Sequence, residues 1–296
     1  MGESRAYRLE SGEPLPEGIA RIARGRIDHA MDELRGKAGS TPEQAVHEAR
    51  KDMKKLRALL RLARGELGER TYARENACFR DAARELAGAR DADVMVATLK
   101  ALQLPDGLGW ELRKRIQDGH SEQRSEGREA AARGAVAILE EARGRIDDWP
   151  LERDSFAALA EGLERTYRRG RREFKEARAE TGTESLHEWR KRVKELWYHA
   201  SLLRCAWPPV MTAFAGEAHE LSDRLGDDHD LAMLAAWVGE HVGPEPELVD
   251  AVEDRRGRLQ SEALALGGRL YAEKPSAYIR WIERLWDAGR AGVRAP

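Results

Sequence analysis

One stretch of this chain of 296 residues occurs twice, and that repetition limits how the chain can fold. Residues 45–56 read AVHEARKDMKKL and residues 185–196 read SLHEWRKRVKEL, so that the shared pattern His-x-x-Arg-Lys-x-x-Lys recurs at an offset of 187 − 47 = 140. Residues 90–94 (RDADV) likewise resemble residues 227–231 (DDHDL). A duplicated motif followed by a second matching motif favours a chain built from two related halves.

Helical signals dominate both halves. Apolar residues recur at spacings of three and four, and runs of alternating β-branched residues are absent. Capping-box patterns at Thr41 to Gln44 and at Thr181 to Glu184 predict where the two motif helices begin. Gly and Pro breaks divide the sequence into about eight or nine helices. We therefore predict an all-α fold of two related helical bundles of about four helices each, residues 1–148 and 149–296.

The charge of the chain is balanced overall but segregated along the sequence. There are 51 Lys and Arg against 53 Asp and Glu, which gives a formal net charge of −2. Between Cys205 and Asp254 twelve acids accompany a single basic residue, Arg224. A uniformly basic nucleic-acid binder is therefore not expected, and an anion site must come from local segregation. Without an apolar leader or a run of about 18 apolar residues, we expect a cytoplasmic protein that is not inserted in a membrane.

The first motif helix concentrates positive charge on one face. At about 100° per residue, six basic residues fall within about 80° of His47, and apolar residues such as Met53 and Leu56 fall opposite. The six are Arg50, Lys51, Lys54, Lys55, Arg57 and Arg61. The second helix repeats the face in shorter form with His187, Arg190, Lys191 and Lys194, followed by Tyr198. Glu195 and Trp197 depart from the first copy, so a weaker cationic contribution is expected beyond Lys194.

Both motif helices carry a cationic face, and further basic residues precede each of them. A helix face that is only solvated is the ordinary explanation of a charge run. Such a face can carry charge of either sign, whereas the motif carries cations in both of its copies. Cations aligned without acids at i+4 repel one another unless an anion occupies the surface. We therefore predict that four basic helices enclose a common anion-binding cleft. The added candidates are Arg21 and Arg24 in the first half and Arg165, Arg168, Arg169, Arg171 and Arg172 in the second.

The doubled motif, the Arg90-Asp-Ala-Asp-Val94 segment and the Arg cluster around Tyr167 resemble the CHAD family, named for histidines that recur in an α-helical domain. The resemblance covers nearly the whole chain. It implies two pseudo-symmetric four-helix bundles whose basic helices line a cavity or groove, binding of inorganic polyphosphate, and localisation to polyphosphate granules. The Glu-x-Glu-x-Lys signature of the triphosphate tunnel enzymes, which many relatives carry as an attached domain, is absent. We thus expect a binding module without catalytic residues, metal or cofactor.

Two other functions remain as alternatives. Asp227, Asp228, His229 and Asp230, with His187 and His219, resemble ligands of metal-dependent phosphohydrolases. The first half lacks the corresponding histidine, so we interpret Asp91, Asp93, Asp228 and Asp230 as helix caps or partners of basic side chains. An RNA-binding helical protein is the second alternative. The motif helix, however, lacks the interleaved aromatic residues on which bases stack.

Overall fold

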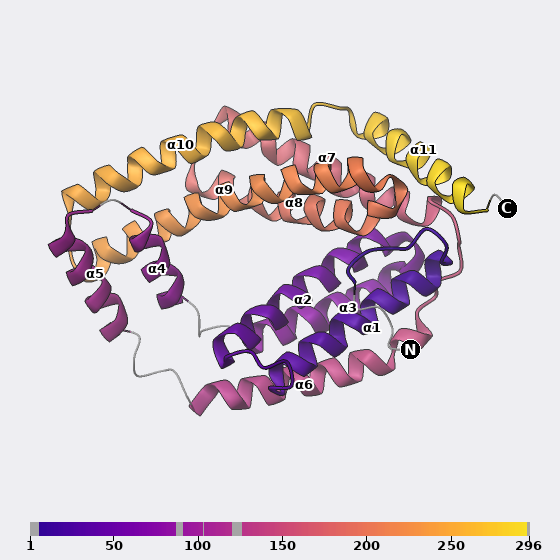
Figure 1. Cartoon of the computed structure of the whole chain (residues 1–296), viewed down its shortest axis with the longest axis horizontal. Coiled ribbons are helices and arrows are strands. Elements are labelled where there is room, and N and C mark those ends of the chain that lie inside the picture. Colours follow the sequence, from indigo (N-terminus) through magenta and orange to yellow (C-terminus); the bar gives the residue numbers. More distant parts are fainter. Residues whose placement is uncertain (1–5, 87–90, 103, 120–125, 295–296) are drawn as a thin grey trace.

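The computed structural model describes residues 6–86, 91–102, 104–119 and 126–294, and these residues form helices and no strand (Figure 1). The predicted all-α fold is confirmed. Eleven α-helices occur in the described ranges, more than the predicted eight or nine, partly because α2 and α3 are separated by Ala63 alone, without Gly or Pro. The helices are α1 (Leu15–Leu34), α2 (Pro42–Leu62), α3 (Arg64–Glu85), α4 (Asp91–Lys100), α5 (Asp106–Gly119), α6 (Glu126–Gly144), α7 (Ala157–Ala179), α8 (Thr183–Leu202), α9 (Pro208–His241), α10 (Pro246–Leu270) and α11 (Pro275–Arg294), with 3-10 helices η1 (Ile146–Asp148) and η2 (Leu203–Ala206).

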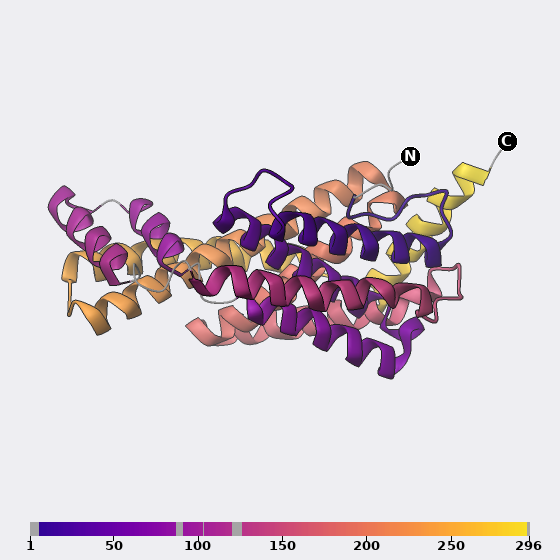
Figure 2. The same cartoon turned by 90° about the horizontal axis from the view of Figure 1, so that it is seen from below.

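The helices pack in two groups joined by a shared core. Helices α1, α2, α3 and α6 lie against one another, and α7, α8, α9 and α10 form a second group (Figures 1 and 2). One apolar core runs through both groups, from Leu59 of α2 to Leu163 of α7 and Leu196 of α8. Burial of this continuous surface is what fixes the two groups against each other.

Helices α4 and α5 form a hairpin away from the main core. Helix α4 packs against α9 at the far end of that long helix, and α5 packs against α4 (Figure 1). Leu99 and Leu112 of the hairpin form a small second core with Leu231 and Val252. Residues from the first half of the sequence thus cover helices of the second half. The boundary between residues 148 and 149 stays a prediction.

Helices α2 and α8 touch near their C-terminal ends. His199 of α8 is fully buried, and its Nε2 donates to the Ala58 carbonyl oxygen of α2 at 2.9 Å. Burial lowers the His199 pKa to about 4, so this imidazole is neutral at pH 7. Gly162 of α7 lies so close to α2 that a Cβ there would sit 2.2 Å from the Leu62 carbonyl oxygen. These contacts position α2, α7 and α8 with little tolerance for larger side chains.

The two motif helices begin differently. Thr41 and Gln44 form the predicted capping box at the start of α2. The predicted cap at Thr181 is wrong, because its hydroxyl donates to the Ala177 carbonyl oxygen and closes the end of α7. Helix α8 therefore starts later, with the Gly182 N–H donating to Ser185 Oγ.

A buried ion pair holds α3 to the end of α6. Glu75 of α3 has no exposed surface. It accepts two hydrogen bonds from Arg145, from Nε at 2.9 Å and from Nη2 at 3.0 Å. A carboxylate that is both buried and bidentately paired is costly to lose, because its guanidinium partner stays behind without compensation.

We expect Glu75→Gln to lower the free energy of unfolding by about 3 kcal/mol. Glu69→Gln is the matched control, because Glu69 pairs with Arg64 on the surface with 70% of its side chain exposed, and an exposed pair contributes about 0.5 kcal/mol. Urea denaturation of both variants measures the difference. Equal losses in the two variants would contradict the role given to the Glu75–Arg145 pair.

Candidate functional site

A pocket of about 330 Å³ lies between the two motif helices. Its lining comes only from α2 and α8, and it combines six basic residues with one carboxylate. The packing of the opposite, apolar faces produces this arrangement, since Met53 and Leu56 of α2 are buried as predicted and Val193 and Leu196 of α8 are buried as well. The lining residues are Lys54, Arg57, Arg61, Lys191, Arg192, Lys194, Glu195 and Tyr198.

The structure brings together residues that lie 140 positions apart. Lys54 and Lys194, which occupy equivalent positions of the two motif copies, line the same pocket and repel each other electrostatically. Arg57, Arg61, Lys191 and Tyr198 are the other predicted candidates found there, whereas Arg192 and Glu195 were not among the candidates. The signal for Glu195 was its departure from the first copy, where Lys55 stands.

Lys194 is the most perturbed cation of the pocket. Burial, followed by repulsion from Arg190 and Lys54, lowers its pKa to about 7. Asp230 and Asp223 on α9 offset this only in part. The ammonium group is therefore near half protonation at neutral pH, and an anion placed beside it would restore the proton.

Acids on the motif helices neutralise part of the predicted cationic column. Glu48 accepts a hydrogen bond from Lys51 Nζ at 3.0 Å. The two residues are three positions apart, whereas the sequence analysis considered acids four positions from each cation. Asp52 is buried, with Arg26 Nη1 at 3.1 Å and His29 Nδ1 at 2.6 Å from its oxygens. Lys55 Nζ lies 3.7 Å from Asp52, which ties it to the α1 side.

The two motif histidines lie outside the pocket lining. The His187 ring contacts His229 of α9 at 4.4 Å between centroids. Burial is the main cause that lowers the pKa of both rings, so both favour the neutral form. His47 Nε2 is 3.9 Å from a Glu48 oxygen. Five predicted candidates on the motif helices do not line the pocket: His47, Arg50, Lys51, His187 and Arg190.

Most arginines of α7 have partners elsewhere. Arg165 pairs with Glu161, Arg168 with Glu164, and Arg172 with Glu173 and Glu176 on the helix itself. Arg171 Nε donates to the Tyr271 carbonyl oxygen at 3.1 Å and so joins α7 to the end of α10.

Arg169 is the α7 arginine whose charge acts on the pocket. Its pKa is lowered by burial and by repulsion from Arg192, with a smaller repulsion from Arg61. Helix α7 thus adds one cation beside Arg192 and Arg61 of the pocket.

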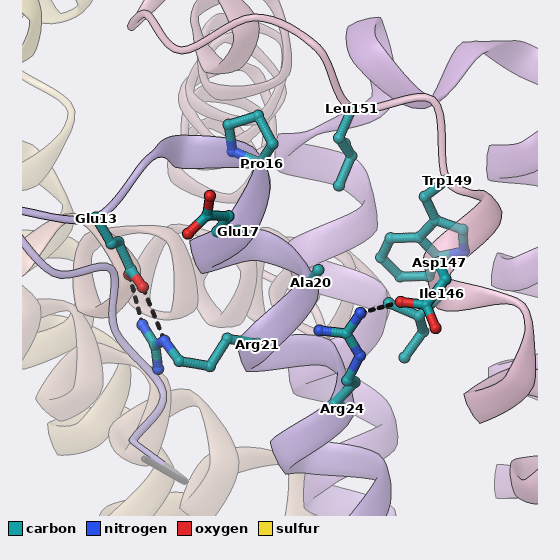
Figure 3. Close-up of a pocket in the computed structure, with 10 residues that line it drawn as sticks. All are labelled: Glu13, Pro16, Glu17, Ala20, Arg21, Arg24, Ile146, Asp147, Trp149 and Leu151. Carbon is teal, nitrogen blue, oxygen red and sulfur yellow. Dashed lines mark hydrogen bonds and ion pairs between the residues drawn. The ribbon is translucent and has the colours of Figure 1, made fainter. Parts of the chain in front are cut away.

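Arg21 and Arg24 of α1 lie in a different cavity, of about 410 Å³ (Figure 3). Arg21 Nε donates to Glu13 Oε2 at 2.8 Å, and Arg24 is paired with Asp147. Of the four basic helices predicted to enclose one cleft, α2 and α8 line the pocket and Arg169 of α7 acts on it, whereas Arg21 and Arg24 of α1 lie elsewhere. The acids of this second cavity offset its two arginines, so it has no excess of positive charge to attract a polyanion.

The ligand set of the metal-dependent alternative is not assembled in the described part of the chain. No group of three His, Cys, Asp or Glu residues suited to a metal occurs there. His219 stacks edge-on against Trp197, and Asp228 lies inside α9, not at a helix start. Asp228 instead accepts from Arg256 Nε at 2.9 Å, which agrees with its interpretation as a partner of a basic side chain. Arg90 and the side chains of Asp91 and Asp93 lie outside the described residues.

Comparisons with known proteins identify the family. The model of the CHAD domain matches residues 21–239, and the chain belongs to that family. The crystal structure of the CHAD domain from the plant Ricinus communis is similar, with a TM-score of 0.63 and 18% sequence identity, over 93% of this chain and 97% of that one. At this identity the likeness establishes the fold. No curated protein matches the sequence significantly. Among the described residues, no helix has both the length and the apolar character needed to cross a bilayer.

The low pKa of Lys194 has a consequence that requires no ligand. We expect an amine-reactive reagent to modify Lys194 with a rate that rises through a midpoint near pH 7, whereas an ordinary lysine titrates near pH 10.4. Peptide mass spectrometry over a pH series measures both this rate and that of the exposed control Lys274. A Lys194 profile that follows Lys274 would contradict the electrostatic description of the pocket.

Proposed function

We propose that this chain binds inorganic polyphosphate, or a similar polyanion, in the pocket between α2 and α8, as a binding module that carries out no catalysis. The observation that carries the proposal is the lining of this pocket, where six basic side chains face one carboxylate. Such an excess of positive charge in a partly enclosed pocket raises the local concentration of anions. CHAD family membership supports the same ligand class.

The composition of the lining suits a ligand recognised by charge. Lys54, Lys191 and Lys194 supply compact ammonium groups that can contact phosphate oxygens, and the guanidinium groups of Arg57, Arg61 and Arg192 add positive charge to the lining. Tyr198 is the single aromatic residue of the lining. A row of stacking platforms for bases is therefore missing from this pocket, which favours polyphosphate over single-stranded RNA.

The wider organisation belongs to the same proposal. The two four-helix groups are interpreted as copies of one duplicated unit, with residues 1–148 and 149–296 as the two halves. Each copy contributes one motif helix to the pocket, so one polymer is held by both. In the cell the module would locate to polyphosphate granules and act there in targeting or as a scaffold.

We expect long-chain polyphosphate to bind with an affinity that falls steeply with salt, because each phosphate contact releases counterions. Lys54→Gln and Lys194→Gln remove one cation from each motif helix. Each is expected to weaken binding about tenfold and to reduce the slope of log affinity against log salt by about one. Isothermal titration calorimetry at several salt concentrations measures both quantities.

Lys274→Gln is the matched control, since this exposed lysine lines none of the described pockets. It should bind like the unmodified chain. Absence of polyphosphate binding at physiological salt would overturn the proposal, and so would an equal loss in all three variants. Competition by excess single-stranded RNA would move the function to nucleic-acid binding, and metal-dependent release of phosphate would move it to hydrolysis.

Binding should also take up a proton above pH 7. The Lys194 pKa is about 7 in the free chain, and a bound polyanion raises it. Affinity should then fall as the pH rises from 7 towards the pKa of the bound state, because deprotonated Lys194 must regain its proton. Calorimetry in buffers of different ionisation enthalpy measures the uptake. Lys194→Arg, which stays charged, should abolish it, and an unchanged uptake in that variant would exclude Lys194 as its source.

A further inference from the structure

The part of the pocket where Arg61 and Arg192 lie, called here its arginine end, is occupied by the carboxylate of Glu195. Glu195 receives two hydrogen bonds from Arg192 Nη1, at 2.7 Å to Oε1 and 2.9 Å to Oε2. Arg61 Nε of the facing helix α2 lies 3.3 Å from Oε1. Only 8% of the Glu195 side chain is exposed. One carboxylate is thus held between guanidinium groups from both motif helices, which is the arrangement that a phosphate group would use.

One carboxylate does not balance the charge around it. Burial is the main cause that lowers the pKa of Arg57 and Arg169, and attraction to Glu195 offsets it in part. With Arg61 and Arg192 there are four guanidinium groups for one carboxylate, or 4 − 1 = +3 charges. The arginine end therefore keeps an excess of positive charge even with Glu195 in place.

Comparison of the two motif copies shows that this carboxylate replaces a cation. In the first copy Asp52 and Lys55 form an i,i+3 pair, and the equivalent positions of the second copy hold Arg192 and Glu195. The pair is present twice with its signs exchanged. The acid of the first copy is buried against α1, whereas the acid of the second copy lines the pocket.

We infer that Glu195 occupies a phosphate subsite at the arginine end of the pocket and limits how much of a polyphosphate chain the pocket holds. The inference rests on the proposed function, since it assigns a ligand boundary to the same pocket. Phosphates bind beside Lys54 and Lys194, whose charges act on each other in the pocket, and the Glu195 carboxylate ends the row of subsites. It does so because like charges repel and because the forks of Arg61 and Arg192 already have an acceptor.

Glu195→Gln tests the inference, because the amide keeps the shape and one acceptor oxygen while it removes the negative charge. We expect this variant to bind tripolyphosphate about tenfold more tightly than the unmodified chain, with a salt slope steeper by about one. Calorimetry with tripolyphosphate and with long-chain polyphosphate measures both. Glu69→Gln, which makes the same change of net charge at a surface ion pair on α3, should leave the affinity unchanged.

The outcomes separate this inference from the proposed function. Polyphosphate binding by the unmodified chain, with equal or weaker binding by Glu195→Gln, would overturn the inference alone and make Glu195 a residue that merely orients the arginines. Absence of binding by both proteins would overturn the proposed function. Circular dichroism and the thermal midpoint establish that the variant is folded. If it is not, Glu195→Asp, which withdraws the charge by one methylene, should give a smaller gain in the same direction, and no gain would overturn the inference.

Discussion

The apolar faces of α2 and α8 hold two rows of like charge close together, and the candidate site depends on that constraint. The cations of the two helices repel one another across the pocket, as the mutual effect of Lys54 and Lys194 illustrates. What keeps them in place is the shared core behind them, with Leu56, Leu59 and Leu196 fully buried. Burial of apolar surface stabilises the fold by more than the repulsion destabilises it.

The excess charge is distributed unevenly along the pocket, and this gives its two ends different chemistry. Where Lys54 and Lys194 lie, burial and repulsion lower the pKa of Lys194. Around Glu195 the guanidinium groups keep their charge, as arginine does in proteins, and the Glu195 carboxylate offsets part of their mutual repulsion. A polyanion bound beside Lys54 and Lys194 would restore the Lys194 proton, while Glu195 keeps its contacts with Arg61 and Arg192.

Packing of helices far apart in the sequence accounts for much of what the sequence analysis missed. Nothing in the composition of residues 91–119 indicated that α4 and α5 would cover α9 and α10, because amphipathic helices of this length fit many partners. The arginines of α7 show the same limit. Their number suggested an anion site, yet acids on α7 itself pair with Arg165, Arg168 and Arg172, while repulsion from Arg192 and Arg61 places Arg169 beside the pocket.

The sequence by itself determined the helical class, the duplicated motif and which face of each motif helix carries charge, because periodicity within one helix is a local property. Only the tertiary structure decided that Lys54 meets Lys194, that Arg21 and Arg24 lie in a separate cavity, and that Glu195 sits among arginines. Those juxtapositions depend on how helices cross, and crossing is set by close packing between distant segments, such as Gly162 against the backbone carbonyl oxygen of Leu62.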